Sequence, residues 1–342
     1  MLKIAINGFG RIGRNILRAF YENSKYVGNI KIVAINDFSP IEHAVHLLKY
    51  DSVHSKFGNN VTIINNDKFE IDNFLQESDT IQYFNKRDIK DLPWADLGVD
   101  VVLECTGLYT KAEAAIQHIH SGAKQVIVSA PCDGADKTIV YGVNEDTLTL
   151  NDKIISNASC TTNCLAPLVA LIHDKFGISQ GFATTIHSYT GDQRLIDTDH
   201  SDLYRARAAN LSMIPSKTGA AKAIGLIIPE LNGKINGVAI RVPTPNVSLV
   251  DFTAVLEKET SKEELNELFK KATLHKHFKG VLGYNDEKLV SVDFNHDSHS
   301  SVFDSTQTFA QGNMIKVFSW YDNEWGFSNR MLDLSMYLAN LR

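Results

Sequence analysis

A cysteine stands in a small polar segment that directly precedes a long apolar helical pattern. The segment runs from Ser156 to Cys164, with Cys160 near its centre. Ser159 is a residue type that caps helix N-termini, so we expect Cys160 in the first turn of a helix. There the backbone N–H groups and the helix dipole favour a thiolate over a thiol. A thiolate of this kind is a nucleophile suited to covalent catalysis.

A histidine further along the chain is a candidate base for this thiol. His187 ends the segment 181–187, for which the pattern predicts a strand. If the fold brings His187 to Cys160, the two residues form an activated nucleophile. Most cysteines are small buried hydrophobes, so residue types alone leave a packing role for Cys160 equally open.

The N-terminus carries the pattern of a dinucleotide-binding turn. Residues 3–7 predict a buried strand, Gly8, Gly10 and Gly13 follow with GxGxxG spacing, and an apolar helical pattern comes next. These glycines permit a tight turn, close approach of a pyrophosphate, and close packing of helix on strand. The helix N-terminus then offers N–H donors to the anion.

An acidic residue follows the second predicted strand at the position expected of a ribose-binding carboxylate. Asp37 lies 24 residues after Gly13. A carboxylate there accepts from the 2′-hydroxyl of NAD and repels the 2′-phosphate of NADP. The strand, the glycines, the helix and the acid together predict NAD as the cofactor. A glycine-rich turn without a ligand is the alternative, and it would not require all four features.

Composition and charge exclude several classes of protein. The 342 residues suffice for two domains, and 44% hydrophobic with 22% charged residues is ordinary for a globular chain. A formal charge of −6 argues against a dedicated nucleic-acid site. No apolar run is long enough to predict a membrane span. The four cysteines do not resemble a disulfide framework, and no metal-ligand spacing occurs, so we expect a cytoplasmic protein without a metal site.

Alternating strand and helix patterns over residues 1–159 predict an α/β fold with a Rossmann-type doubly wound parallel sheet. Residues 160–325 predict an α+β catalytic domain with a mostly antiparallel sheet. The expected strands of that sheet include 181–187, 236–242, 246–257, 288–293 and 314–320. A C-terminal helix within 326–342 is expected to return and complete the first domain.

Two segments of the second domain predict contact with another subunit. The strand 246–257 is apolar on both faces, so both faces need a cover. Residues 189–215 are polar, long and aperiodic, which indicates a functional segment or a surface that another subunit buries.

Six segments, in this order, closely resemble the family of phosphorylating glyceraldehyde-3-phosphate dehydrogenases. They are 7–14, 156–167, 187–193, 218–223, 241–246 and 319–324. The likeness extends from residue 3 to about residue 335. It implies oxidation of glyceraldehyde 3-phosphate with NAD and inorganic phosphate to 1,3-bisphosphoglycerate. It also implies a homotetramer, with the second domain at the interface.

The resemblance further assigns roles to individual residues. Cys160 would attack the aldehyde and carry a thioester, and His187 would take its proton. The implied cofactor contacts are Gly8, Gly10, Arg11, Ile12, Gly13, Asp37, Thr106, Ser129 and Asn323, of which Asn323 would hold the nicotinamide carboxamide. Arg241 and Thr190 would bind the substrate phosphate. Inorganic phosphate would meet Ser159, Thr218, Gly219 and Arg205, and Thr161 is also counted among the substrate-binding residues.

A few positions depart from the family pattern. Phe327 stands where tyrosine is common, Lys217 stands where serine or threonine is usual, and Thr198-Asp199 replaces a Leu-Pro pair of many NAD-specific members. Residues 290–301 also resemble erythrose-4-phosphate dehydrogenase, which is an alternative reading. That enzyme usually lacks the loop found here at 218–221. A protein that uses this surface only to bind partners is the other alternative.

Overall fold

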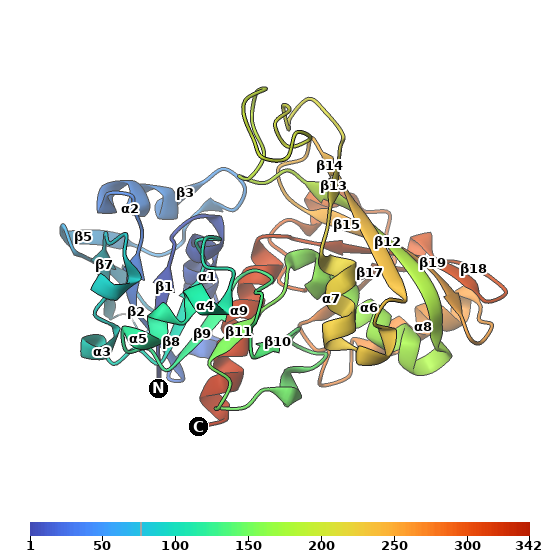
Figure 1. The fold of residues 1–342 in the computed structure, drawn as a ribbon, viewed down its shortest axis with the longest axis horizontal. Coiled ribbons are helices and arrows are strands. Elements are labelled where there is room, and N and C mark those ends of the chain that lie inside the picture. The colour runs from blue at the N-terminus through green and yellow to red at the C-terminus, as the bar shows by residue number, and fades with distance from the viewer. Residues whose placement is uncertain (76) are drawn as a thin grey trace. The chain divides into compact units, whose positions relative to one another are not determined.

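The structure is a computed structural model that describes residues 1–75 and 77–342. The chain forms two compact units, drawn with their elements in Figure 1. Unit 1 comprises residues 1–139, 145–158 and 328–342, and unit 2 comprises residues 140–144 and 159–327. The sequence pattern predicts a strand-rich patch over 61–84, and one position within it, residue 76, lies outside the described residues.

Unit 1 is built on a nine-stranded sheet with the order β10-β11-β9-β8-β1-β2-β7-β6-β5. The seven strands from β10 to β7 run parallel, and β6 and β5 extend that edge antiparallel. The strands are β1 Leu2–Asn7, β2 Ile30–Asn36, β5 Val61–Asn65, β6 Lys68–Asp72, β7 Ser78–Phe84, β8 Val101–Glu104, β9 Gln125–Val128, β10 Lys137–Thr138 and β11 Ile154–Ser156. The predicted Rossmann-type parallel sheet is confirmed.

The helices of unit 1 connect these strands. They are α1 Arg11–Glu22, α2 Ile41–Lys49, α3 Trp94–Leu97, α4 Ala112–Ala115, α5 Gln117–His120 and most of α9 Trp325–Asn340, and a small hairpin pairs β3 Tyr50–Asp51 with β4 Ser55–Lys56. The sequence pattern predicts one helix over 111–121, whereas the structure has two short helices that meet at Ile116. The sequence pattern also predicts a strand over 138–141, but the strand found there, β10, comprises only Lys137 and Thr138.

Unit 2 contains an eight-stranded sheet with the order β13-β14-β12-β15-β19-β17-β16, and β18 also pairs with β19. Only β12 with β14 and β16 with β17 are parallel pairs, so the mostly antiparallel sheet is confirmed. The strands are β12 Ile178–Ser188, β13 Ile214–Lys217, β14 Ile235–Val242, β15 Ser248–Leu256, β16 Leu282–Asn285, β17 Ser301–Asp304, β18 Phe309–Gln311 and β19 Met314–Tyr321. The helices are α6 Cys160–Phe176, α7 Ala220–Ile227 and α8 Lys262–Ala272.

The strand expected over 288–293 is wrong. Its last residues lie in a short 3-10 turn, Ser291–Phe294, where the Val290 N–H donates to the Asp293 carboxylate at 2.8 Å. The structure instead places β16 and β17 in the sheet. All four residues of β17 are buried, so this strand lacks the polar alternation by which a half-buried strand is found.

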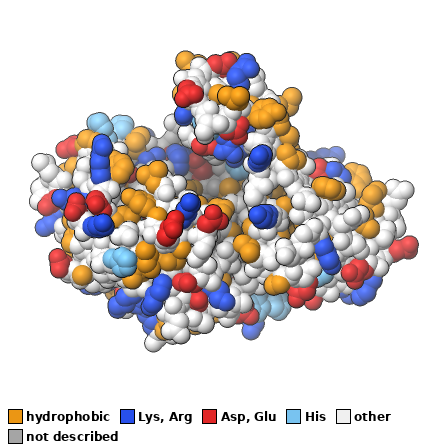
Figure 2. Space-filling model, in the orientation of Figure 1, with side chains coloured by type: hydrophobic (Ala, Val, Ile, Leu, Met, Phe, Trp, Pro, Cys, Tyr) orange, Lys and Arg blue, Asp and Glu red, His pale blue; other side chains and the backbone are white. Residues whose placement is uncertain are grey.

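One face of the unit 2 sheet is only partly covered. Helix α6 packs against β12, β15, β17 and β19. Along β15 the residues from Ser248 to Leu256 alternate between buried and half-buried side chains. The segment 189–213 connects β12 to β13 (Figure 1), and hydrophobic side chains gather on the surface that Figure 2 shows there. Its exposed large apolar side chains are Leu195, Ile196, Leu203, Tyr204, Leu211 and Met213. Unit 2 thus presents apolar surface that its own elements leave open.

Candidate active site

Helix α6 begins at Cys160, and local structure determines that start. The Ser159 hydroxyl accepts from the Thr162 N–H at 3.1 Å, which is the predicted N-cap. The preceding residue, Ala158, has φ 55° in the left-handed region, a conformation that a β-carbon disfavours. Such strain is characteristic of functional turns. The thiol is therefore held at a defined point in the first turn of the helix.

The structure brings His187 to this thiol. His187 is the penultimate residue of β12, and its Nε2 atom lies 3.6 Å from the Cys160 Sγ atom. Only 4% of His187 is exposed. The fold thus brings His187 to Cys160, as an activated nucleophile requires. A thiol and an imidazole at this distance can exchange a proton.

Arg241 lies against the other side of the imidazole. The parallel pairing of β12 with β14 places Arg241 opposite His187. Its Nη1 atom is 2.7 Å from His187 Nδ1 and 3.1 Å from the Ser188 carbonyl oxygen, which is itself 2.7 Å from Nδ1. Burial, reinforced by the charge of Arg241, lowers the pKa of His187 to about 3. His187 is therefore neutral at physiological pH.

Burial acts on the thiol in the opposite sense. It raises the pKa of the Cys160 thiol, although the charge of Arg241 and the amide of Thr161 lower it. The amide of Thr161 at the helix N-terminus thus acts on the pKa in the sense that the sequence predicts, but the opposing effect of burial is larger. Burial thus favours a thiol beside a neutral imidazole, and the imidazole can act as the base.

Tyr321 is a site residue that the sequence analysis missed. Its buried hydroxyl makes hydrogen bonds with the hydroxyls of Thr161, at 2.9 Å, and Thr185, at 2.8 Å. Its ring also packs edge-on against the imidazole of His187, with centroids 6.0 Å apart. Tyr321 thus joins the start of α6 to β12. The signals in the sequence were its place at the end of an apolar strand and within the segment 319–324 that carries the family resemblance.

Asn323 is held in one orientation by two buried serines. Its Oδ1 atom accepts from the hydroxyls of Ser188, at 2.8 Å, and Ser248, at 2.9 Å. The side-chain NH2 group is therefore the donor that Asn323 can offer to a ligand. Ser248 follows Val247, a β-branched residue with φ 66°. This second strained residue fixes where β15 begins.

The remaining predicted phosphate ligands are Thr190, Arg205, Thr218 and Gly219, all of which belong to unit 2. Arg205 pairs with Asp192 and lies 3.5 Å from the Asp202 carboxylate. Thr190 follows β12, while Thr218 and Gly219 precede α7, where the Thr218 hydroxyl accepts from the Ala220 N–H at 3.2 Å. Within the described chain no hydrogen bond joins these four residues to Cys160 or to His187. The structure groups Ser159, Cys160, Thr161, His187 and Arg241.

Unit 1 contains a separate cavity of about 240 Å³ at the carboxyl ends of its strands. Its lining residues are Asn7, Gly8, Gly10, Asn36, Asp37, Phe38, Lys86, Arg87, Ile89, Cys105, Thr106, Leu108 and Tyr109. Asp37 is anchored by the amides of Phe9 and Ser39, at 2.7 and 2.8 Å. Each of its carboxylate oxygens can accept a further hydrogen bond, as a ribose hydroxyl would require.

The three glycines of the GxGxxG segment have the properties that a dinucleotide requires. A Cβ on Gly8, where φ is 93°, would lie 2.6 Å from the Thr106 nitrogen. A Cβ on Gly13 would lie 2.1 Å from the Gly8 carbonyl oxygen. A Cβ on Gly10 would have nothing within 4 Å, so the backbone is open to a ligand there. The residues present therefore fit NAD.

The other predicted cofactor contacts lie beside the cavity. Arg11 and Ile12 begin α1, and Ser129 follows β9, where its N–H donates to the Glu104 carbonyl at 2.9 Å. The Arg11 guanidinium pairs with Asp51. Although burial raises the pKa of Asp51, the bonds from Arg11 and two backbone amides hold it at about 2. Arg11 thus offers an anion its backbone N–H, while its charge is engaged by Asp51.

The described chain holds no group of three or more histidine, cysteine or acidic side chains that could bind a metal ion. Nor does any helix within that part of the chain have the length and apolar character to cross a membrane.

Comparison with known proteins agrees with both sites. Residues 2–112 match the NAD binding domain of glyceraldehyde 3-phosphate dehydrogenase, and residues 159–323 match its C-terminal domain. Glyceraldehyde-3-phosphate dehydrogenase of Cereibacter sphaeroides is 54% identical over 99% of each chain. The chromosomal enzyme of Cupriavidus necator is 54% identical over 100% of this chain and 99% of its own. Glyceraldehyde-3-phosphate dehydrogenase 1 of Bacillus subtilis is 49% identical over 99% and 98%. The resemblance inferred from the sequence is confirmed, with NAD as the cofactor, and the chain belongs to the glyceraldehyde-3-phosphate dehydrogenase family.

Proposed function

We propose that this protein oxidises D-glyceraldehyde 3-phosphate to 1,3-bisphosphoglycerate with NAD and inorganic phosphate. The observation that carries the proposal is the 3.6 Å contact between Cys160 Sγ and His187 Nε2 at the start of α6. Family membership supports it. The curated relatives described above are named glyceraldehyde-3-phosphate dehydrogenase, which favours this reaction over the oxidation of erythrose 4-phosphate.

The chemistry follows from the protonation states of the pair. Neutral His187 takes the thiol proton as Cys160 Sγ attacks the aldehyde carbon, and it passes this proton to the former carbonyl oxygen, so that the product is a thiohemiacetal on sulfur beside a neutral imidazole. NAD, when bound, accepts the hydride that this oxidation releases. His187 takes the hydroxyl proton in the same step, which leaves a thioester on Cys160. Inorganic phosphate then attacks the acyl carbon, the sulfur leaves, and the proton on His187 returns to it.

The two anions of the reaction need separate cationic or hydroxyl-rich sites. We assign the substrate phosphate to Arg241 and Thr190. We assign the attacking phosphate to hydroxyl, backbone N–H and guanidinium donors of Ser159, Thr161, Arg205, Thr218 and Gly219. The exposed side chain of Lys217 adds positive charge next to Thr218. Because Arg241 also contacts His187, the same guanidinium serves both the anion and the base.

The two units divide the work. We assign NAD binding to the domain 1–159, completed by the helix in 326–342, through Gly8, Gly10, Arg11, Ile12, Gly13, Asp37, Thr106 and Ser129. We assign catalysis and the subunit interface to 160–325, where Asn323 donates to the nicotinamide carboxamide.

We also assign a homotetramer in the cytoplasm. The exposed apolar side chains of 195–213 and the partly covered face of the unit 2 sheet support assembly. Sedimentation of a monomer at micromolar concentration would contradict the assembly.

The decisive experiment traps the acyl-enzyme. The protein is incubated with the triose phosphate and NAD but without phosphate, and the modified peptide is identified by mass spectrometry. We expect the acyl group on Cys160, release on adding phosphate, and no acylation of Cys160→Ser. The matched control is Cys164→Ser, since Cys164 lies in the same helix but is fully buried against Ser301 and Ser319. Acylation at another residue would refute the proposal.

A further inference from the structure

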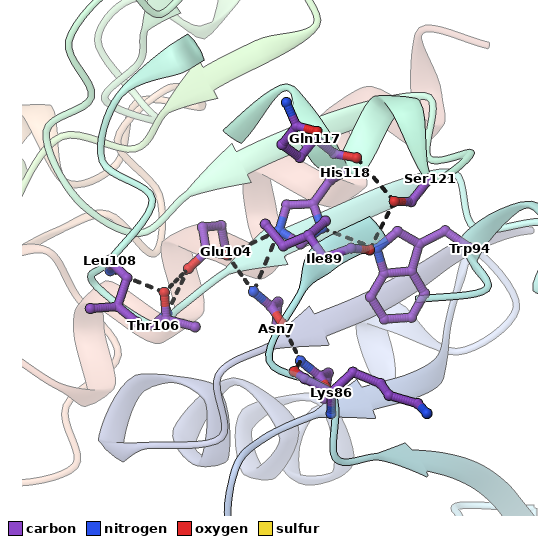
Figure 3. A network of polar contacts seen from close by, with 11 residues as sticks. Asn7, Lys86, Ile89, Trp94, Glu104, Thr106, Leu108, Gln117, His118 and Ser121 are labelled. Atoms are coloured by element: carbon purple, nitrogen blue, oxygen red, sulfur yellow. Dashed lines mark hydrogen bonds and ion pairs between the residues drawn. The ribbon is translucent and has the colours of Figure 1, made fainter. Parts of the chain in front are cut away.

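Two chains of hydrogen bonds converge on one buried carboxylate beside the unit 1 cavity (Figure 3). Glu104 is the last residue of β8 and is 1% exposed. Its Oε2 atom lies 2.6 Å from Asn7 Nδ2 and 3.0 Å from His118 Nε2. Its Oε1 atom accepts from the Thr106 N–H at 2.8 Å and from the Thr106 hydroxyl.

The first chain fixes the tautomer of His118. The indole N–H of Trp94 can only donate, and it lies 3.0 Å from His118 Nδ1. Nδ1 must therefore accept, so the ring proton is on Nε2, which donates to Glu104. A proton on Nδ1 would set two donors against each other inside the core. Trp94 and His118 are both fully buried, so water cannot replace either bond.

The second chain fixes the amide of Asn7. The Lys86 N–H donates to Asn36 Oδ1 at 2.9 Å, and Asn36 Nδ2 donates to the Lys86 carbonyl at 3.0 Å. These backbone groups leave Asn36 only one orientation, in which Nδ2 also donates to Asn7 Oδ1 at 2.8 Å. Asn7 Nδ2 must then donate to Glu104. All four groups that face the carboxylate are donors, as an ionised carboxylate requires.

Some residues of this network line the cavity, and the others lie behind the lining and form hydrogen bonds within the network. Asn7, Asn36, Lys86 and Thr106 are lining residues, whereas Trp94, Glu104 and His118 are not. The Glu104 carboxylate accepts hydrogen bonds from both Asn7, at the end of β1, and Thr106. The Thr106 nitrogen would lie 2.6 Å from a Cβ built on Gly8. A change in the hydrogen bonds of Glu104 would thus move Asn7 and Thr106, which line the cavity next to Gly8.

We infer that Glu104 and His118 are positioning residues for NAD, and that the neutral Nε2–H form of His118, set by Trp94, holds the cavity in its binding shape. The inference rests on the proposed binding of NAD in unit 1. Neither residue touches the ligand. Each acts through Asn7 and Thr106.

Two substitutions at one position separate the two bonds of the imidazole. In His118→Gln the amide nitrogen takes the place of Nε2 and can still donate to Glu104. In His118→Asn the amide oxygen takes the place of Nδ1 and can still accept from Trp94, but the donor to Glu104 is gone. We expect both variants to lose thermal stability to a similar degree. We expect NAD affinity within about threefold of wild type for His118→Gln and at least about tenfold weaker for His118→Asn.

A third variant tests the carboxylate directly. In Glu104→Gln either orientation of the amide sets an N–H against donors, so we expect NAD affinity to fall by about tenfold or more. Affinities are measured by calorimetry on the full-length protein without substrate. The control is Gln125→Ala, a buried polar residue at the opposite end of β9 that bonds the Asp152 carbonyl at 2.8 Å, which should lower stability but not NAD affinity. In all variants, alkylation of Cys160 should keep the wild-type rate.

The outcomes are distinct. Equal NAD affinity in His118→Gln and His118→Asn, or wild-type affinity in Glu104→Gln, would overturn the inference while leaving the proposed function intact. If His118→Asn fails to fold, Glu104→Gln, which preserves volume, decides by itself. If the wild-type protein does not bind NAD, the proposed function fails and the inference fails with it.

Discussion

The glycine turn of unit 1 allows a prediction in which stability and cofactor affinity separate. In Gly13→Ala the new Cβ would lie 2.1 Å from the Gly8 carbonyl oxygen and 3.2 Å from the Ile6 side chain. The nearest atom is backbone, so relief requires a shift of roughly 1 Å between α1 and the turn, and overpacking this severe costs about 3 kcal/mol, the upper end of the usual range. Alanine recovers about 1 kcal/mol of helix propensity. We expect a net loss of about 2 kcal/mol, together with weaker NAD binding.

Gly10→Ala is the matched variant. Its Cβ would meet nothing within 4 Å and its φ of −73° suits any residue, so we expect stability within about 1 kcal/mol of wild type. The methyl group would nevertheless occupy the approach of the pyrophosphate, so we expect NAD affinity to fall by about tenfold or more. Urea denaturation at one protein concentration and calorimetry with NAD measure the two quantities. Wild-type stability of Gly13→Ala, or wild-type NAD affinity of Gly10→Ala, would refute this reasoning.

Three further predictions concern single groups. Asp37→Asn should reduce discrimination against NADP, because the charge that repels a 2′-phosphate is lost; unchanged preference in parallel titrations with both cofactors would count against this role. Arg241→Ala should raise the pKa of the Cys160 thiol, since the guanidinium lowers it, and should move alkylation by iodoacetamide to higher pH. Arg241→Lys, which keeps the charge, should leave the pH profile of alkylation as in the wild type. Identical alkylation profiles for the wild type and Arg241→Ala would exclude the electrostatic effect. Ser159→Ala should cost about 1 kcal/mol as a lost N-cap and weaken phosphate-dependent turnover. Ser261→Ala, which removes the equivalent cap of α8, should cost the same but leave turnover unchanged.

Local patterns predicted much of this protein because the interactions behind them are local. The cap at Ser159 spans three residues, and the N-terminal glycines and the predicted strand and helix around them form one continuous segment. Strands with polar alternation or long apolar runs were found for the same reason. The strand expected over 288–293 was wrong, because these residues lie in a loop and a 3-10 turn. The short, wholly buried β17 carried no alternation to detect.

What the sequence alone determined was the set of reactive groups and their local settings: a capped helix that starts at a cysteine, a glycine turn after a strand, and an acid after the next strand. Only the tertiary structure decided their protonation and orientation. His187 meets Cys160 across 27 positions, Arg241 meets His187 across 54, and Tyr321 meets Thr161 across 160. Such contacts depend on strand register and helix docking rather than on neighbouring residues. Burial, which makes the Cys160–His187 pair neutral, exists only once the chain has folded around it.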